Sequence, residues 1–276
     1  MTGRAGDALT YMGAALVAVF FAAPFVWLLS LSLRTPAEVY LGASRLIPEA
    51  PTWGNFATIL RDPAFAIYLW NGVKLAASGA ALAVVLAVPA GYACSRIDFR
   101  AKPAVMLGIL AVQMVSPLVI LIPLYAWIDR IGLLDTDLAV IAVYGAIGLP
   151  LSVWLLKASF DAIPIEIEEV AAIDGASRAQ ILTRITLPLA APGLASAFIL
   201  TMIMNWSQFL VPFILLESDA NWPISVAIFN FAGSTSASTT QILAAACIVA
   251  VIPAVAVFVT LQRMIVSALI DGAVKG

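Results

Sequence analysis

Residues 168–188 have the sequence EEVAAIDGASRAQILTRITLP, the one strongly polar stretch between two long apolar segments in the second half of the chain. Pro164 and the glutamates that follow it favour the N-terminal turn of a helix, where negative charge is stabilised by the helix dipole. Gly175 is expected to end this helix, because glycine adopts the left-handed conformation at no steric cost. Ser177 is expected to cap a second short helix, about 178–185, which stops at Pro188. The stretch therefore predicts a helix–turn–helix.

Composition places this polar stretch in a membrane protein. The chain has 276 residues, of which 63% are hydrophobic and 11% charged, and its mean hydropathy is +1.04. A soluble domain of this length is about 25% charged and about half apolar. The net charge of −2 and the lack of a basic stripe give no indication that the chain binds nucleic acid. Histidine is absent, which excludes a histidine-based metal site, and Cys94 and Cys247 are expected to be buried free thiols.

Six apolar segments are long enough to span a bilayer, since about 20 helical residues cross the hydrocarbon core. Prolines inside them predict kinked helices that pack on neighbours. The expected fold is an all-α integral membrane protein, a single domain over 1–276. The spans run approximately over 9–33, 75–94, 104–128, 138–156, 189–216 and 242–261.

Basic residues predict the orientation in the membrane. The 95–103 loop carries three basic residues, whereas the 217–240 loop carries none. Both termini, Lys275 included, and the 159–188 loop are therefore expected in the cytosol. Arg45 falls in the long outer loop that follows the first span, in which residues 55–60 are expected to form a short helix.

The polar loop resembles the signature of the permease subunits of type I ABC importers. The resemblance rests on the spacing of Glu169, Gly175, Ile185, Leu187 and Pro188. Val170 departs from it, because the family usually has alanine there. On the residues alone, the alternative is an amphipathic helix lying on the membrane surface.

Further marks of the resemblance are spread over almost the whole chain. Asn71 opens the second span as in many relatives, and residues 96–100 look like the family's basic-aromatic turn. Trp206 begins a pattern similar to Trp-Asn-Glu-Phe-Leu, with Ser207 and Gln208 replacing Asn and Glu. The ending, residues 271–276, looks like the tail of the carbohydrate-uptake branch. Together these marks resemble the smaller six-span permease of a maltose-type sugar importer.

The resemblance implies a bacterial inner-membrane transport subunit that is not an enzyme and binds no cofactor, since ATP and magnesium would bind a separate ATPase. It implies four kinds of partner: a second, related permease, two ATP-binding subunits, an extracytoplasmic sugar-binding protein and the lipid membrane. The substrate is expected to be a disaccharide such as trehalose or maltose. The residues implied in coupling to the ATPase are Glu168, Glu169, Ala171, Asp174, Gly175, Arg178, Leu187 and Pro188.

Uncharged polar residues inside the spans indicate a translocation pathway, because such groups usually face a cavity or another helix. Thr201, Asn205, Gln208 and Pro212 are spaced to share one helical stripe, and Gln113 and Ser116 are neighbours in the third span. Amides, hydroxyls and aromatic rings suit a sugar. The alternative is interhelical hydrogen bonding, worth about 0.6–2 kcal/mol per contact. The predicted pathway residues are Gln113, Tyr144, Thr201, Asn205, Trp206, Gln208 and Phe209.

The outer loop, residues 217–240, has an apolar centre that includes Trp222 and Phe229. It resembles the family's segment that inserts into the binding protein. The alternative is a loop packed on its own helices.

Other classes of function fit the sequence less well. A stand-alone secondary transporter would need an intramembrane acid or base. An intramembrane enzyme would need a Gly-x-Ser-x-Gly elbow or paired mid-span carboxylates, and the chain has neither, nor a phosphate-binding loop. A permease for another solute, such as a polyamine or phosphate, stays open, although the uncharged pathway argues against charged solutes.

Overall fold

The computed structural model describes residues 3–42, 46–233 and 240–273, which form helices and no strand. The predicted all-α fold is confirmed. The chain divides into two compact units, Met1–Ala66 with Ala227–Ile252, and Ile67–Val226 with Pro253–Gly276; the single domain expected over 1–276 stays a prediction. Arg45, Lys275, part of the predicted outer loop (234–239) and the end of the family-like tail (274–276) lie outside the described residues.

In the first unit, the segment after helix α1 (Gly3–Ser32) folds back on the end of that helix. The Asn55 side-chain amide donates to the carbonyls of Ser32 and Arg34, both at 2.8 Å. Asn55 belongs to α3 (Gly54–Arg61), which confirms the short helix expected at 55–60. These bonds tie the outer segment to the last turn of α1.

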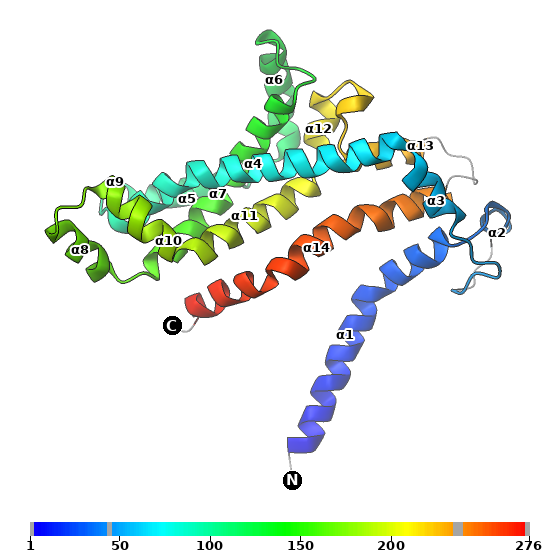
Figure 1. The fold of residues 1–276 in the computed structure, drawn as a ribbon, viewed down its shortest axis with the longest axis horizontal. Coiled ribbons are helices and arrows are strands. Elements are labelled where there is room, and N and C mark those ends of the chain that lie inside the picture. Colours follow the sequence, from blue (N-terminus) through cyan, green and yellow to red (C-terminus); the bar gives the residue numbers. More distant parts are fainter. Residues whose placement is uncertain (1–2, 43–45, 234–239, 274–276) are drawn as a thin grey trace. The chain divides into compact units, whose positions relative to one another are not determined.

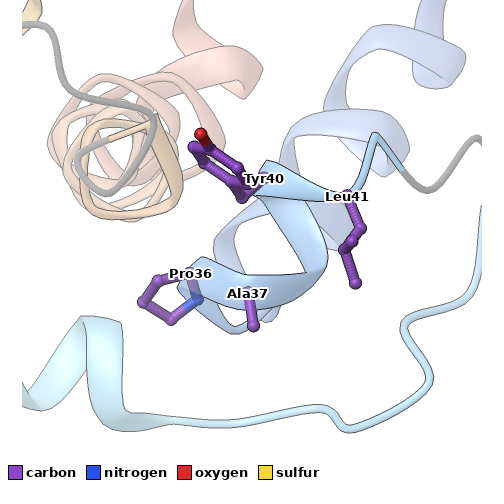
Figure 2. A pocket seen from close by; sticks show the side chains of 4 residues that line it. All are labelled: Pro36, Ala37, Tyr40 and Leu41. Carbon is purple, nitrogen blue, oxygen red and sulfur yellow. The ribbon is translucent and has the colours of Figure 1, made fainter.

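A separate short helix, α2 (Pro36–Tyr40), carries an open hollow (Figure 2). Its lining comes from one stretch of chain and is apolar: Pro36, Ala37, Tyr40 and Leu41. Tyr40 and Leu41 are exposed. The Tyr40 hydroxyl is the one polar side-chain group among these four residues.

Helix α4 (Pro63–Arg96) begins twelve residues before the second span expected at 75–94. Asn71, which is expected to open the second span, therefore lies inside the helix, eight residues after its first residue. Pro63 fits this earlier start, since proline is tolerated in the first turn of a helix. The extra turns bring Asn71 next to the connection that follows α12.

In the second unit, α4, α7 (Asp137–Asp161) and α11 (Ala191–Trp206) lie side by side (Figure 1). Glycines bring them close. A Cβ on Gly79 of α4 would lie 2.5 Å from Tyr144 Cβ, and one on Gly148 of α7 would lie 2.5 Å from Thr201 Cγ2. Small residues at these crossings let the backbones approach, as membrane helices require.

Two of the six expected spans are broken. The segment expected over 104–128 forms α5 (Lys102–Val112) and α6 (Pro117–Arg130), separated at 113–116. The segment expected over 189–216 forms α11 and α12 (Leu210–Leu215). Among the residues that the structure describes, four helices are long and apolar enough to cross a membrane, or five if the pair 178–189 and 191–206, bent by 75°, counts as one span. The membrane character is confirmed, and the count of six spans stays a prediction.

The remaining helices complete the two units. Helices α8 (Ile165–Ile173), α9 (Arg178–Ile181) and α10 (Leu187–Leu189) follow α7, with a π-helical turn, η1 (Leu182–Thr186), between the last two. A short 3₁₀ turn (Asp219–Asn221) precedes α13 (Ile224–Gly233) and α14 (Thr240–Ala273). Both cysteines are free, Cys94 buried and Cys247 half-buried.

Candidate functional site

Helix α8 and the turn after it have the geometry expected from the sequence. Pro164 is the N-cap of α8, and Glu166 and Glu168 lie in its first turn. Gly175 has φ of 87°, in the left-handed region. Its N–H bonds the Ala172 carbonyl at 3.1 Å, and the Ala176 N–H bonds the Ala171 carbonyl at 3.0 Å. This pair of bonds is a Schellman motif, which satisfies the last carbonyls of the helix.

The second helix of the pair is also capped as predicted, but its path continues further. Ser177 accepts from the Gln180 amide at 3.4 Å, and Gln180 Oε1 accepts from the Ser177 amide at 2.8 Å, which completes a capping box. The expected stop at Pro188 is wrong, because the helical path runs on through η1 and α10 to Leu189. The bend comes at Ala190, between α10 and α11.

Glu168 is buried, with 7% of its surface exposed, and its carboxylate accepts three hydrogen bonds from the chain itself. Oε1 accepts from Arg96 Nε at 2.9 Å and from Thr186 Oγ1 at 3.0 Å. Oε2 accepts from the Tyr92 hydroxyl at 2.8 Å. A buried carboxylate is stable only when paired and hydrogen-bonded, and here both conditions hold.

The end of α4 that carries Arg96 also holds the end of α7. Arg96 donates from its second terminal nitrogen to the Ile163 carbonyl at 2.9 Å. The Ser95 hydroxyl donates to Asp161 at 2.5 Å, and Lys157 Nζ lies 2.5 Å from the other Asp161 oxygen. The last two turns of α4 thus contact both sides of the α7–α8 connection.

Most of the other predicted coupling residues are accessible. The exposed ones are Glu169, Asp174, Gly175, Arg178 and Pro188, while Ala171 and Leu187 are half-buried. Helix α8 also exposes apolar side chains, and Ile173 is 84% exposed. Ile165, Ile167 and Val170 are exposed on the same helix. Sequence reasoning grouped Glu168 with Glu169, but in the structure these neighbours face different surroundings.

Sequence reasoning did not find the partners of Glu168. Tyr92 and Thr186 went unremarked, and Arg96 was noted only as part of a basic-aromatic turn. Arg96 and Glu168 lie 72 residues apart, so no local periodicity connects them. The available signal was an arginine at the end of an apolar span, which requires a counter-charge if the helix end is buried.

Three of the predicted pathway residues on α7 and α11, Tyr144, Thr201 and Asn205, are buried between helices, and Trp206 is half-buried. Ser152 and Thr201 share a hydrogen bond of 3.1 Å, and the Asn205 amide donates to the Ala76 carbonyl at 3.3 Å. The Tyr144 hydroxyl donates to the Gln208 carbonyl at 3.5 Å. These are the interhelical bonds of the alternative interpretation, and a role in translocation stays a prediction.

The predicted stripes do not form, because the helices that would carry them are interrupted. Helix α11 ends at Trp206, so Gln208 lies in the break before α12 and off the stripe of Thr201 and Asn205. Gln113 is exposed at the C-cap of α5 and Ser116 is the N-cap of α6, so they flank a break. Trp206 lies 3.0 Å from the position of a Cβ on Gly72, and Phe209 stacks on Phe213 with ring centroids 4.8 Å apart.

At the other end of α7, Asp135 holds the start of the predicted outer loop. It adopts a positive φ of 57°, and its carboxylate accepts from the amides of Glu217 and Ser218, both at 3.0 Å. It also accepts from the Ser218 hydroxyl and from Asn221. Burial raises the pKa of Asp135, but these hydrogen bonds outweigh it and lower the pKa to about 2.

Asn71 fixes the same loop from α4. Its side-chain amide donates to the carbonyls of Ala220 at 2.8 Å and Trp222 at 3.2 Å. Trp222 is half-buried and packs against the core cluster that includes Leu75 and Tyr144. This packing agrees with the alternative interpretation, in which the loop packs on the helices of its own chain. Phe229, on α13, is exposed. Contact of either residue with a binding protein stays a prediction.

Comparison with known proteins places this geometry in a family. Residues 79–271 match the model of the binding-protein-dependent transport system inner membrane component. The trehalose transport system permease protein of Mycobacterium tuberculosis is 36% identical over 92% of each chain. The trehalose/maltose transport system permease protein of Thermococcus litoralis is 32% identical over 97% of this chain and 96% of its own.

A solved structure has the same fold. A chain from a bacterial ABC transporter involved in the import of the acidic polysaccharide alginate superposes with a TM-score of 0.78. The alignment covers 95% of this chain and 98% of that chain at 23% identity. The family match spans α7, α8, the Gly175 turn and α11. The chain therefore belongs to the family of inner membrane components of binding-protein-dependent transport systems.

Proposed function

We propose that this chain forms half of the translocation pathway of an ATP-driven importer of a neutral sugar. The observation that carries the proposal is the build of α8 and its turn. An exposed helix with apolar side chains, ended by a rigid Schellman turn, is fastened to the body of the chain through Glu168. Such a helix suits a docking site for a separate ATPase, because its exposed side chains can bind a partner while Glu168 fixes its first turn to the rest of the chain.

The partners follow from this assignment. They are a second related permease, two ATP-binding subunits that hold ATP and magnesium, and an extracytoplasmic binding protein that delivers the sugar. The 159–188 segment and both termini face the cytosol in this proposal, and the Asp135 loop faces outward. Asp135 precedes the first residue of α7 and Asp161 is its last, so the two loops lie at opposite ends of one membrane-spanning helix.

ATP binding would change the separation of the two ATPase subunits and move α8. The movement can drive transport only if the ATPase has different contact free energies with the two states of the permease. Glu169, Asp174, Gly175 and Arg178 are exposed where the ATPase would bind. Gly175 sets the direction of the chain between α8 and α9.

A disaccharide such as trehalose or maltose is the proposed substrate. The names of the two relatives support this class. The buried polar side chains described in α7 and α11 are Tyr144, Ser152, Ser196, Thr201 and Asn205, all uncharged. Hydroxyls and amides pair with sugar hydroxyls and offer no counter-charge to a polyamine or a phosphate, which disfavours those alternative solutes.

The test is reconstitution of the purified complex in liposomes. The chain is tagged, extracted gently with its partners, identified by mass spectrometry and assayed for ATP-dependent uptake of radiolabelled trehalose and maltose. Gly175→Asp is expected to reach the membrane but to abolish uptake, because the new side chain is strained at φ of 87° and alters the docking turn.

Gly132→Asp is the matched control. Gly132 has φ of 69°, has no neighbour within 4 Å of an added Cβ, and lies in the loop before α7. It suffers the same kind of backbone strain away from the docking turn and should retain uptake. Normal uptake by Gly175→Asp, or purification of an active chain without an ATPase, would contradict the proposal and favour a stand-alone transporter.

A further inference from the structure

We infer that Glu168 is a positioning residue that fastens the coupling helix α8 to α4, so that the two move as one body when the ATPase displaces α8. The inference rests on the proposed function, since it assigns how movement of the docking helix enters the membrane helices. It separates Glu168 from its neighbour Glu169: the first acts inside the chain and the second faces the partner.

The geometry of the carboxylate supports a fixed attachment. Three donors from two other segments converge on it: Tyr92 and Arg96 from α4, and Thr186 from η1. The Arg96–Glu168 pair is almost fully covered, with side-chain exposures of 10% and 8%. Charge-assisted hydrogen bonds are short and directional, and in a covered site they are weakly screened by salt.

Arg96 strengthens the attachment by holding a second point. Its terminal nitrogen binds the Ile163 carbonyl, one residue before the N-cap of α8. Helix α8 is thus held to α4 on both sides of Pro164. The backbone already joins α8 to α7 through residues 162–164, so the base of α8 has a covalent link to α7 and an ionic link to α4.

The Arg96–Glu168 pair lies where it can transmit movement from α8 to α4, in addition to stabilising the fold. Coupling between distant sites is carried by packed elements and hydrogen-bond networks that have two discrete arrangements. Without the Glu168 link, α8 would be joined to the membrane helices through its chain connections, to α7 on one side and to α9 on the other, and its displacement could be absorbed by rotation about these connections. With the link, α4 must follow, and α4 packs against α7 at Gly79.

Single substitutions of the pair should separate ATP hydrolysis from transport. In the reconstituted complex, Glu168→Gln and Arg96→Gln are expected to keep the ATPase bound while sugar transported per ATP hydrolysed falls about 5-fold or more, the lower range of site coupling. The Glu168→Gln/Arg96→Gln double variant leaves no unpaired charge and should lose less than the product of the two single effects.

Asp129→Asn is the matched control, because it also removes one exposed carboxylate charge, but Asp129 lies on α6, away from both α8 and the cluster. It should keep the wild-type ratio of sugar to ATP. A role confined to stability predicts a lower melting temperature and less assembled complex, but an unchanged ratio in the complexes that do assemble. An unchanged ratio in assembled Glu168→Gln would therefore overturn the inference.

A second measurement does not need the pair to be disrupted. Spin labels are placed on cysteines introduced at Glu166 of α8 and at Ile97, just after α4, with Cys94 and Cys247 replaced by alanine. The interspin distance should be the same in the nucleotide-free and ATP-bound states of the complex. A distance that differs between the two states would show that α8 moves relative to α4 and would overturn the inference.

The two proposals fail in distinguishable ways. If Gly175→Asp abolishes uptake while the Glu168 variants keep the ratio of sugar to ATP, the proposed function is supported and the inferred role of the link between α8 and α4 is contradicted. If no ATPase copurifies and Gly175→Asp transports normally, both fall.

Discussion

At the scale of the residue, glycine decides how closely the membrane helices approach. Gly148 of α7 faces Thr201 of α11 and Ala83 of α4. Thr201 is β-branched and its χ1 is restricted in a helix, and its hydroxyl is engaged with Ser152. A neighbour of that kind cannot move aside for an added methyl group.

Gly148→Ala is therefore expected to lower the stability of the chain. The new Cβ would lie 2.5 Å from Thr201 Cγ2, and overpacking of this kind costs about 1–3 kcal/mol. Gly108→Ala is the control, because Gly108 of α5 has nothing within 4 Å of an added Cβ, and alanine there gains up to about 1 kcal/mol in helix propensity. Thermal unfolding in detergent should give a lower midpoint for the first variant than for the second, and equal midpoints would contradict this packing.

At the scale of the element, Asp135 joins the start of α7 to the chain that leaves α12. Its carboxylate pKa is about 2 in the fold, below the ordinary value of about 3.9. A depressed pKa means that the stabilising contribution is complete above the unfolded value and is lost as pH falls through the folded one. Protection of the 216–222 backbone should thus be constant from about pH 5 to pH 8 and fall only in stronger acid.

Asp135→Asn tests the same junction at neutral pH. The variant keeps one acceptor oxygen for the Glu217 and Ser218 amides, but it loses the charge that strengthens those two bonds and the second oxygen that accepts from the Ser218 hydroxyl. Hydrogen exchange measured by mass spectrometry should be faster at 216–222 and unchanged in α8. Equal exchange in both proteins would show that Asn71 alone holds the loop.

The elements also show how far the sequence predicts this fold. The helix–turn–helix at 165–186 was predictable because its signals are local: a proline start, a glycine at positive φ and a serine cap. The breaks at 113–116 and 207–209 were not, because hydropathy averages over a window and remains high across a kink. Ser116 has an extended ψ of 129° before Pro117, as residues that precede proline prefer, but the sequence alone does not say whether such a helix bends or breaks.

The coupling residues also divide into those whose surroundings follow from local sequence and those whose surroundings depend on distant segments. Exposure of Asp174, Gly175 and Arg178 follows from their place in a polar turn. Burial of Glu168 depends on Arg96, Tyr92 and Thr186, which come from distant segments. Long-range contacts of this kind are invisible to spacing rules, so the shape and exposure of the turn were predictable and its internal anchor was not.

At the scale of the whole molecule, the exposed apolar side chains of α8 require a partner. Ile173, at its last turn, is 84% exposed. Burying an isoleucine side chain gains about 1.5–3 kcal/mol. An interface centred on α8 would cover this residue together with Val170, which is 60% exposed.

Ile173→Ser is expected to reduce the amount of ATPase recovered with the tagged chain. If the interface covers the Ile173 side chain fully, the affinity for the ATPase should fall about tenfold or more. Ile131→Ser is the control, because Ile131 is also exposed, at 45%, but lies in the loop at the opposite end of α7. Titration of the purified ATPase onto immobilised permease measures both. Equal affinities would place the ATPase away from this end of α8.

The Arg96–Glu168 contact also orders events during synthesis. Arg96 leaves the ribosome 72 residues ahead of its counter-ion, which at about 5–20 residues per second is a wait of roughly 4–14 s. Through that interval α4 ends in an unneutralised guanidinium, while α5, α6 and α7 are still being made. The pair closes only when the polar loop has emerged, so its closure marks the moment at which the α4–α7 half of the permease is complete.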